Sequence, residues 1–371
     1  MTSLTKKELL AQSLTRHHVL QRASRLQVVS DLCGLQAQFA TGPREALRIR
    51  ARDYTEDGWD RGLVKIWSHR GTIHVVPASE LGLHLSARGN TGSLTEAWHG
   101  WGIPLSEVER WADVIRERAA AGMGEREELK RACVAAGMAP ELVPRIFNGW
   151  GGLLKEMCDR GMLVYEAGTS KRFTLPPEEP VWMPRDEARA MFVRRYFEHF
   201  GPATIADCAA FLGYPSSEVA GLVRCAGLPL RRVTCDGVEL FYLGDLDPEA
   251  RVPGCVYLAG FDQLVLGYRN RSRFARTEDL PHITNRAGIV FPIVLYRGRA
   301  CARWKLVGKR LSITEFRPLS QTARDAIAAR GRRLFAEKRI VVGFQTEADL
   351  PAPKPFNLET LPSALRGSSE G

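Results

Sequence analysis

The chain has 371 residues, 44% hydrophobic and 25% charged, which is the balance of a globular protein built from two to four compact units. No apolar run approaches the length of a membrane span and no secretory signal opens the sequence, so we expect a cytoplasmic protein that does not enter a membrane. The formal net charge of +10 favours a polyanionic partner, with nucleic acid first.

The first informative stretch is LQAQ, residues 35–38, which follows a predicted helix. Ser24 is expected to cap that helix and Gly34 to end it. Side chains two positions apart point the same way on an extended segment, but to nearly opposite sides of a helix. We therefore expect Gln36 and Gln38 to face outward together, toward one target. The alternative is a pair of surface glutamines at a helix end.

A unit of two helices and a β-hairpin recurs along the chain, and similar short phrases introduce the hairpins at residues 60–64, 159–164 and, more loosely, 226–228. Helix, tight turn, helix and a two-stranded wing make up the winged helix-turn-helix. The predicted helices are residues 125–136, 141–159, 203–211 and 217–225, and the predicted hairpins are residues 66–76, 162–175 and 230–243.

Local signals refine these elements. Ser216 is expected to cap the helix that follows it, and the second and third hairpins are expected to turn at residues 167–169 and at Asp236-Gly237. Farther along, β-rich sequence is predicted over 256–268 and 288–307, with a turn at 297–299, and a last helix over 320–337.

The predicted fold class is therefore α+β, with tandem winged-helix units followed by a basic, β-rich region. The expected boundaries are residues 1–88, 89–185 and 186–248 for the three units, 249–350 for the β-rich region and 351–371 for a loose tail rich in Pro and Ser.

Most of the net charge lies in residues 265–310, where eleven Lys or Arg stand against Glu278 and Asp279, a local balance of +9. Aromatic residues alternate with these arginines, as a surface that binds phosphates and stacks on bases requires. The alternative is a solvated sheet face whose arginines pair with carboxylates from elsewhere. The residues predicted to bind DNA are Arg269, Arg271, Arg273, Arg297, Arg299, Arg303 and Lys305.

Motifs for metals and cofactors are missing from the sequence. The eight cysteines are scattered without a CxxC or a Cys/His ligand spacing, and HExxH, GxxxxGK[ST] and GxGxxG do not occur. We expect no metal and no cofactor.

Four phrases resemble the winged-helix DNA glycosylases of the AlkZ/YcaQ type: GLQAQ (34–38), RGTIHVV (70–76), FDQLVLGYRNRSRF (261–274) and GIVFPIVLYRGRACARWK (288–305). The resemblance runs from the first helix to about residue 350. Gln-x-Gln matches the AlkZ-like branch, because the YcaQ-like branch carries an acidic residue at the position of Gln38. The resemblance implies a C-shaped protein with a basic channel, which excises alkylated purines from double-stranded DNA and in some members unhooks interstrand crosslinks.

The chemistry of such lesions suits two amides. A purine alkylated at N7 or N3 is cationic and leaves as a neutral base, so it needs little help from a general acid. Gln36 and Gln38, the predicted catalytic residues, would orient the attacking water, since a carboxamide both accepts and donates hydrogen bonds. An amide does not titrate near neutral pH, so uracil and unmodified purines should not be excised at useful rates.

Three further residues have two interpretations each. Thr72 and His74 share a strand face that the resemblance places near the glutamines, and His74 either binds substrate or a phosphate or is a structural histidine. Asp262 either lines the channel or supports Arg269 and Arg271. The alternative function is a winged-helix transcriptional regulator, but three units in tandem and no evident dimerisation helix favour a monomeric enzyme.

Overall fold

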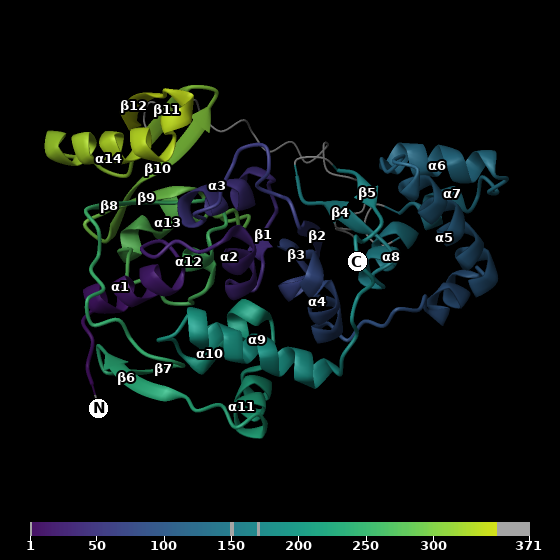
Figure 1. Ribbon diagram of the computed structural model, residues 1–371, viewed down its shortest axis with the longest axis horizontal. Coiled ribbons are helices and arrows are strands. Elements are labelled where there is room, and N and C mark those ends of the chain that lie inside the picture. The colour runs from purple at the N-terminus through teal and green to yellow at the C-terminus, as the bar shows by residue number, and fades with distance from the viewer. Residues whose placement is uncertain (1, 149–151, 169–170, 347–371) are drawn as a thin grey trace, which may run out of the picture.

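The computed structural model describes residues 2–148, 152–168 and 171–346, which form a mixed α+β structure. The helices of residues 105–159 gather at one end, on the right of Figure 1, and the last sheet with its covering helix lies at the opposite upper end. The tail predicted over 351–371 lies outside the described residues. Within the described ranges, no helix has the length and apolar character needed to cross a membrane.

In the amino-terminal part of the chain, the LQAQ stretch lies between the helices α2 and α3. The Ser24 hydroxyl accepts the backbone N–H of Gln27, which confirms the predicted cap. Gly34 follows the helix with a φ of +86°, and a Cβ there would lie 3.1 Å from a side-chain carbon of Val76, so this position favours glycine. The elements are α1 (Lys6–Arg16), α2 (Arg25–Asp31), β1 (Leu35–Gln36) and α3 (Thr41–Arg50).

The first two predicted hairpins both exist, and they share one sheet. Its five strands run in the order β1-β3-β2-β4-β5, because β2 pairs with β4 of the second hairpin. The predicted turn of that second hairpin includes Thr169, which lies outside the described residues. The strands are β2 (Leu63–Trp67), β3 (Ile73–Pro77), β4 (Val164–Glu166) and β5 (Phe173–Thr174), and α4 (Leu81–Ala87) follows β3.

The helices at the right of Figure 1 have a hydrophobic core of their own, centred on Trp111, Ile115 and Leu129. The prediction of one helix over 141–159 is wrong, because the first of two short helices ends at Ile146 and neither Phe147 nor Asn148 continues it. The helices are α5 (Leu105–Ala120), α6 (Arg126–Ala135), α7 (Val143–Ile146) and α8 (Leu153–Asp159).

The third helix pair and its hairpin form as predicted, with one difference. The last helix begins at Ser216 itself, after Pro215, and no side chain caps it, so the predicted Ser216 cap is wrong. Asp236 and Gly237 both have positive φ, of 50° and 76°, as a two-residue hairpin turn requires. The elements are α9 (Arg185–His199), α10 (Ile205–Leu212), α11 (Ser216–Cys225), β6 (Arg231–Cys235) and β7 (Val238–Tyr242).

The carboxyl-terminal region contains a five-stranded sheet in the order β12-β11-β10-β9-β8. The β-rich prediction over 256–268 holds only as far as Leu258, because the Asp262 carboxylate caps a short helix that follows. The predicted last helix is confirmed with Ser320 as its cap. The elements are β8 (Cys255–Leu258), α12 (Gln263–Leu266), α13 (Leu280–Ile283), β9 (Ile293–Tyr296), β10 (Arg299–Val307), β11 (Arg310–Glu315), α14 (Gln321–Leu334) and β12 (Val341–Thr346).

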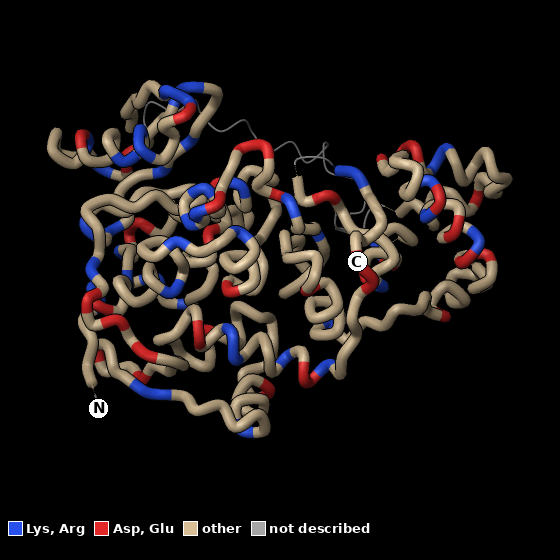
Figure 2. The backbone as a smooth tube through the Cα atoms, viewed as in Figure 1, with Lys and Arg blue, Asp and Glu red and all other residues tan. Residues whose placement is uncertain are grey.

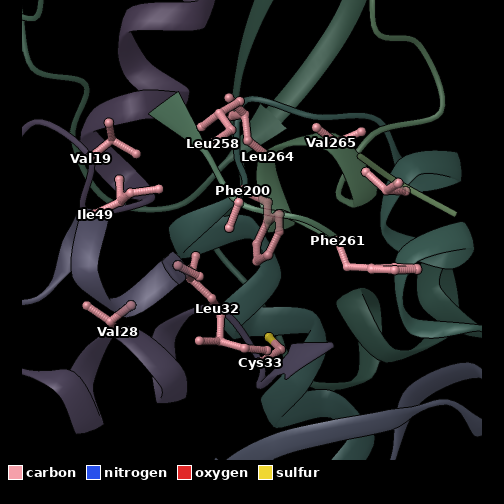
Figure 3. Close-up of a cluster of buried hydrophobic side chains, with 14 of the residues drawn as sticks. Val19, Val28, Leu32, Cys33, Ile49, Phe200, Leu258, Phe261, Leu264 and Val265 are labelled. Carbon is pink, nitrogen blue, oxygen red and sulfur yellow. The ribbon is translucent and has the colours of Figure 1, made fainter. Parts of the chain in front are cut away.

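One hydrophobic core joins parts of the chain that are distant in sequence. Figure 3 shows Leu32 and Cys33 after α2, Ile49 of α3, Phe200 after α9 and Leu264 of α12 in the same cluster. Burial of each large apolar side chain stabilises the fold by roughly 1.5–3 kcal/mol. This core therefore fixes the LQAQ stretch against the segment that follows β8.

Candidate functional site

LQAQ is a β-strand only over Leu35–Gln36, and only its second glutamine is exposed. Leu35 and Ala37 point into the core, and Gln36 pairs with His74 across β1 and β3. Gln36 is itself only 8% exposed, whereas Gln38 is open to solvent. The expectation that both amides face outward is therefore wrong for Gln36, which packs inside the molecule.

Arg70 holds the buried amide in place. One guanidinium nitrogen donates to Oε1 of Gln36 at 2.9 Å, and another donates to the backbone oxygen of Phe211. Burial lowers the pKa of Arg70 to about 10, which still leaves the side chain charged at neutral pH. Sequence reasoning missed this residue, although it lies in the quoted RGTIHVV phrase. Its left-handed backbone, with φ of 57°, is set by the tight turn between β2 and β3.

His74 and Thr72 are structural in this arrangement. His74 is fully buried, and its Nδ1 lies 3.0 Å from the Thr72 backbone oxygen, which can only accept, so Nδ1 carries the proton. Burial lowers the pKa of His74 to about 3, which keeps the ring neutral. The Thr72 hydroxyl donates to the backbone oxygen of His69 within the turn. The prediction that His74 binds a phosphate is wrong for this structure, because no phosphate reaches a fully buried ring.

Asp262 is also structural, and its partner is neither Arg269 nor Arg271. Its carboxylate forms an ion pair with Arg50 at 2.7 Å, and both side chains are wholly buried. The same carboxylate accepts the backbone N–H groups of Ala259 and Leu264. With these internal contacts, Asp262 does not line an open channel, and that prediction is wrong.

The FDQ phrase nevertheless lies directly against LQAQ. The side-chain amide of Gln263 donates to the backbone oxygen of Gly34. At Gly42 a Cβ would lie 2.9 Å from the backbone oxygen of Gly260, so the start of α3 passes close to this loop. The rings of Phe39 and Phe261 are 5.9 Å apart, and Phe39 is 52% exposed. An exposed aromatic ring thus follows Gln38 immediately, a feature that sequence reasoning also missed.

The residues predicted to bind DNA differ in how far their side chains are exposed to solvent. Arg269, Arg297, Arg299 and Lys305 are exposed, whereas Arg271 and Arg303 are half-buried and donate to neighbouring oxygen atoms. The Arg299 guanidinium donates to the backbone oxygen of Ser272, which brings the β9–β10 turn beside the 269–273 segment.

Arg273 does not belong to this exposed set. It is buried, lies 3.4 Å from the centre of the Tyr268 ring and donates to the Ser13 hydroxyl. Its prediction as a phosphate ligand is therefore wrong. Lys and Arg are not confined to residues 265–310, because Figure 2 shows them scattered over the chain together with Asp and Glu.

Comparison with known proteins identifies the family of the chain. The family model described as DNA glycosylase AlkZ-like matches residues 29–336. An interstrand DNA cross-link repair glycosylase from Streptomyces sahachiroi is 31% identical over 315 residues, 79% of this chain and 85% of that protein. The structure of Streptomyces sahachiroi DNA glycosylase AlkZ gives a TM-score of 0.73 at 27% identity and covers 93% of this chain and 100% of that one.

These similarities confirm the resemblance noted from the four phrases and decide between an enzyme and a transcriptional regulator. The chain belongs to the AlkZ-like family of DNA glycosylases, enzymes of DNA repair that hydrolyse N-glycosyl bonds.

Proposed function

We propose that the protein excises cationic N7- or N3-alkylated purines from double-stranded DNA, with Gln36 and Gln38 orienting the water that attacks the sugar. The observation that carries this proposal is the environment of the Gln36 amide. Gln36 is buried and receives its hydrogen bond from a cation, Arg70, while the neighbouring carboxylate of Asp262 is fully engaged with Arg50. Such a site favours substrates that leave without a proton from the enzyme.

The two glutamines would have different roles in the reaction. Arg70 occupies one lone pair of the Gln36 oxygen, and the second lone pair and the NH2 group supply hydrogen bonds of fixed direction. Gln38, on the exposed side, would meet the lesion as it leaves the duplex. Pre-positioned dipoles of this kind stabilise a developing oxocarbenium ion without reorganising during the reaction.

Interstrand crosslinks between guanine N7 atoms fit the same chemistry. The named activity of the Streptomyces sahachiroi relative is interstrand cross-link repair. A crosslink through the N7 atoms of two guanines presents a cationic purine on each strand, so hydrolysis at either purine would separate the strands. We propose bifunctional N7 adducts as a second substrate class.

Three helix-turn-helix units with hairpin wings would hold the DNA as a monomeric, C-shaped enzyme. The support is the order of the elements: α6 to α8 precede β4 and β5, and α10 and α11 precede β6 and β7. The boundaries at residues 88, 185, 248 and 350 remain predictions, and the pairing of β2 with β4 ties the first two units together.

The deciding experiment uses a duplex with a single N7-methylguanine, followed by alkali to cleave at any abasic site. We expect strand breaks at the lesion with the wild-type protein. A matched duplex with uracil at the same position should remain intact. If the protein binds the methylated duplex but produces no break above the untreated control, the proposed substrate class is wrong. A duplex crosslinked between guanine N7 atoms, resolved on a denaturing gel, tests unhooking separately.

A further inference from the structure

Three side chains that the glycosylase site does not use meet at a junction of three helices. His18 follows α1, Asp31 ends α2 and His199 ends α9. Nε2 of His18 lies 2.7 Å from one carboxylate oxygen of Asp31, and Nε2 of His199 lies 3.2 Å from the other. The ligand atoms of the three residues all lie within 4.8 Å of one another.

The backbone and the surrounding contacts hold this cluster in place. His18 adopts φ of 60°, a left-handed conformation that is uncommon for a residue other than glycine and requires support from its surroundings. The Gln27 side-chain amide donates to Asp31 at 2.6 Å and orients the carboxylate. The three side chains are 15%, 9% and 24% exposed, so they are sheltered but not sealed.

The cluster opens to solvent on one side. His18 and His199 line a surface pocket of about 680 Å³, together with Gln27 and Ser24. A water molecule or a small anion can approach both rings from this pocket. Two imidazoles and one carboxylate can supply the three protein ligands of a four-coordinate site. The pocket leaves the fourth position open to solvent.

We propose that His18, Asp31 and His199 form a binding site for one divalent transition-metal ion, with Zn²⁺ the ion that this ligand set suits best. Zinc binds imidazole nitrogen and carboxylate oxygen at about 2.0–2.2 Å, which places tetrahedral ligand atoms roughly 3.3 Å apart. The His199 separation of 3.2 Å is already near that value, whereas the His18 pair, at 2.7 Å, would have to move apart as the ion replaces its hydrogen bond. A metal ion binds the neutral form of imidazole.

Nearby arginines do not occupy the metal position. The Arg16 guanidinium donates to the backbone oxygens of Leu243 and Asp245, both at 2.9 Å. Arg195 is bound by both carboxylate oxygens of Glu80, at 2.8 and 3.0 Å. The competing interpretation is that Asp31 only accepts hydrogen bonds from two neutral imidazoles. A bound ion would tie α1, α2 and α9 together just before the strand that carries Gln36.

The test is metal binding by the full-length protein after treatment with a chelator. Titration with Zn²⁺ in a calorimeter should show one equivalent bound, and the melting temperature should rise with added Zn²⁺. Co²⁺ should give visible bands of a site with nitrogen and oxygen ligands, without the near-ultraviolet charge-transfer band of a thiolate. The variants are His18→Gln, His199→Gln and Asp31→Asn. The controls are His99→Gln, which removes an exposed histidine paired with Glu96, and Cys225→Ser, which removes an exposed thiol.

We expect each ligand variant to weaken Zn²⁺ binding by at least about 10-fold, since loss of a residue that merely hydrogen-bonds to a metal ligand already costs roughly 10–100-fold. Both controls should bind like the wild type. If Asp31→Asn fails to fold, the proposal is tested with His18→Gln and His199→Gln, because both histidines are partly exposed. The proposal is overturned by an absence of stoichiometric binding, by equal binding in the ligand variants, or by loss of binding in Cys225→Ser alone.

Discussion

At the scale of single residues, the two glutamines differ in a way that decides how each should be tested. Gln36 is buried and bonded to Arg70, so its substitution removes a structural contact as well as a reactive group. Gln38 is exposed, so its side chain contributes little to packing. A change at Gln38 therefore separates chemistry from stability more cleanly than a change at Gln36.

Gln38→Ala is expected to slow single-turnover excision of N7-methylguanine by ~10²-fold, the usual effect of removing one positioned hydrogen-bonding group. The melting temperature and the affinity for the duplex should stay within error of the wild type, because only an exposed side chain is removed. A variant that melts far below the wild type would instead identify Gln38 as a structural amide.

Phe39 provides the second test at this scale. Its ring is half-exposed beside Gln38 and touches Phe261, so it offers an apolar face to an unstacked base. Stacking of a base on an aromatic ring contributes roughly 1–3 kcal/mol. Phe39→Ala should therefore weaken binding of the lesion-bearing duplex by about 10-fold, as measured by fluorescence anisotropy, and Phe39→Tyr should retain affinity. Equally weakened binding in both variants would exclude stacking.

At the scale of secondary-structure elements, buried charges and buried neutral rings hold the site together. Arg50 of α3 and Asp262 before α12 form an ion pair without access to water, and this pair joins the two segments that flank LQAQ. Farther from it, His69, His74 and His84 are buried around β3 and α4, with ring centres of neighbouring pairs 5.4 and 5.8 Å apart. Both features tie stability to the elements that position Gln36.

Asp262→Ala should lower the free energy of unfolding by roughly 3–5 kcal/mol, because it leaves the Arg50 guanidinium buried without its counter-charge. Urea denaturation with linear extrapolation measures the change. The matched control is Asp113→Ala, which removes an exposed carboxylate next to Arg116 and should be nearly neutral. If Asp262→Ala is as stable as the wild type but excises more slowly, Asp262 acts in the reaction rather than in folding.

The three buried histidines around β3 and α4 predict that the folded protein loses stability in acid. Burial lowers the pKa of His69, His74 and His84 in the folded protein, that of His74 to about 3. Below pH 6.5 the unfolded chain therefore binds more protons than the folded one, so stability is complete above that pH and falls as the pH decreases. Each such histidine contributes roughly 1.4 kcal/mol per pH unit. Melting temperatures from pH 8 to pH 4 should fall less steeply in His74→Gln, provided that this variant folds; an unchanged slope would contradict the assignment.

At the scale of the whole molecule, DNA affinity depends on which arginines reach the surface, not on how many the segment contains. Arg269, Arg297 and Arg299 are exposed, and the hydrogen bond from Arg299 to Ser272 places them in one neighbourhood. Arg273 carries the same charge in the same stretch but lies inside, against Tyr268. Only the exposed residues can release counterions from DNA.

Replacing Arg269 and Arg297 together by Ala should weaken binding of alkylated and plain duplexes alike. The slope of log affinity against log salt should become shallower by roughly two, about one unit for each phosphate that the variant no longer neutralises. Arg332→Ala with Arg333→Ala, two exposed residues in the last turn of α14, removes the same charge outside the three helix-turn-helix units and serves as the control. An effect confined to the lesion-bearing duplex would mean that these arginines recognise the damage.

The sequence by itself determined the local structure and the family. Hydrophobic spacing, Ser24, Gly34 and the Asp236-Gly237 turn specify helices and hairpins through interactions within a few residues, and these elements form nearly where they were predicted. The LQAQ phrase identified the extended segment and the two amides. These features can be predicted from the sequence because caps, turns and side-chain periodicity depend on residues that are close together along the chain.

Only the tertiary structure decided which of the polar residues are buried and with what partner. Arg70 lies 34 residues from Gln36, and Arg50 lies 212 residues from Asp262, so no local pattern pairs them. Likewise Arg273 and Arg269 have identical side chains in one short segment, yet one packs inside and one faces solvent. Burial and charge pairing are set by contacts between distant segments, and the hydrophobic core that brings those segments together forms only when the whole chain folds.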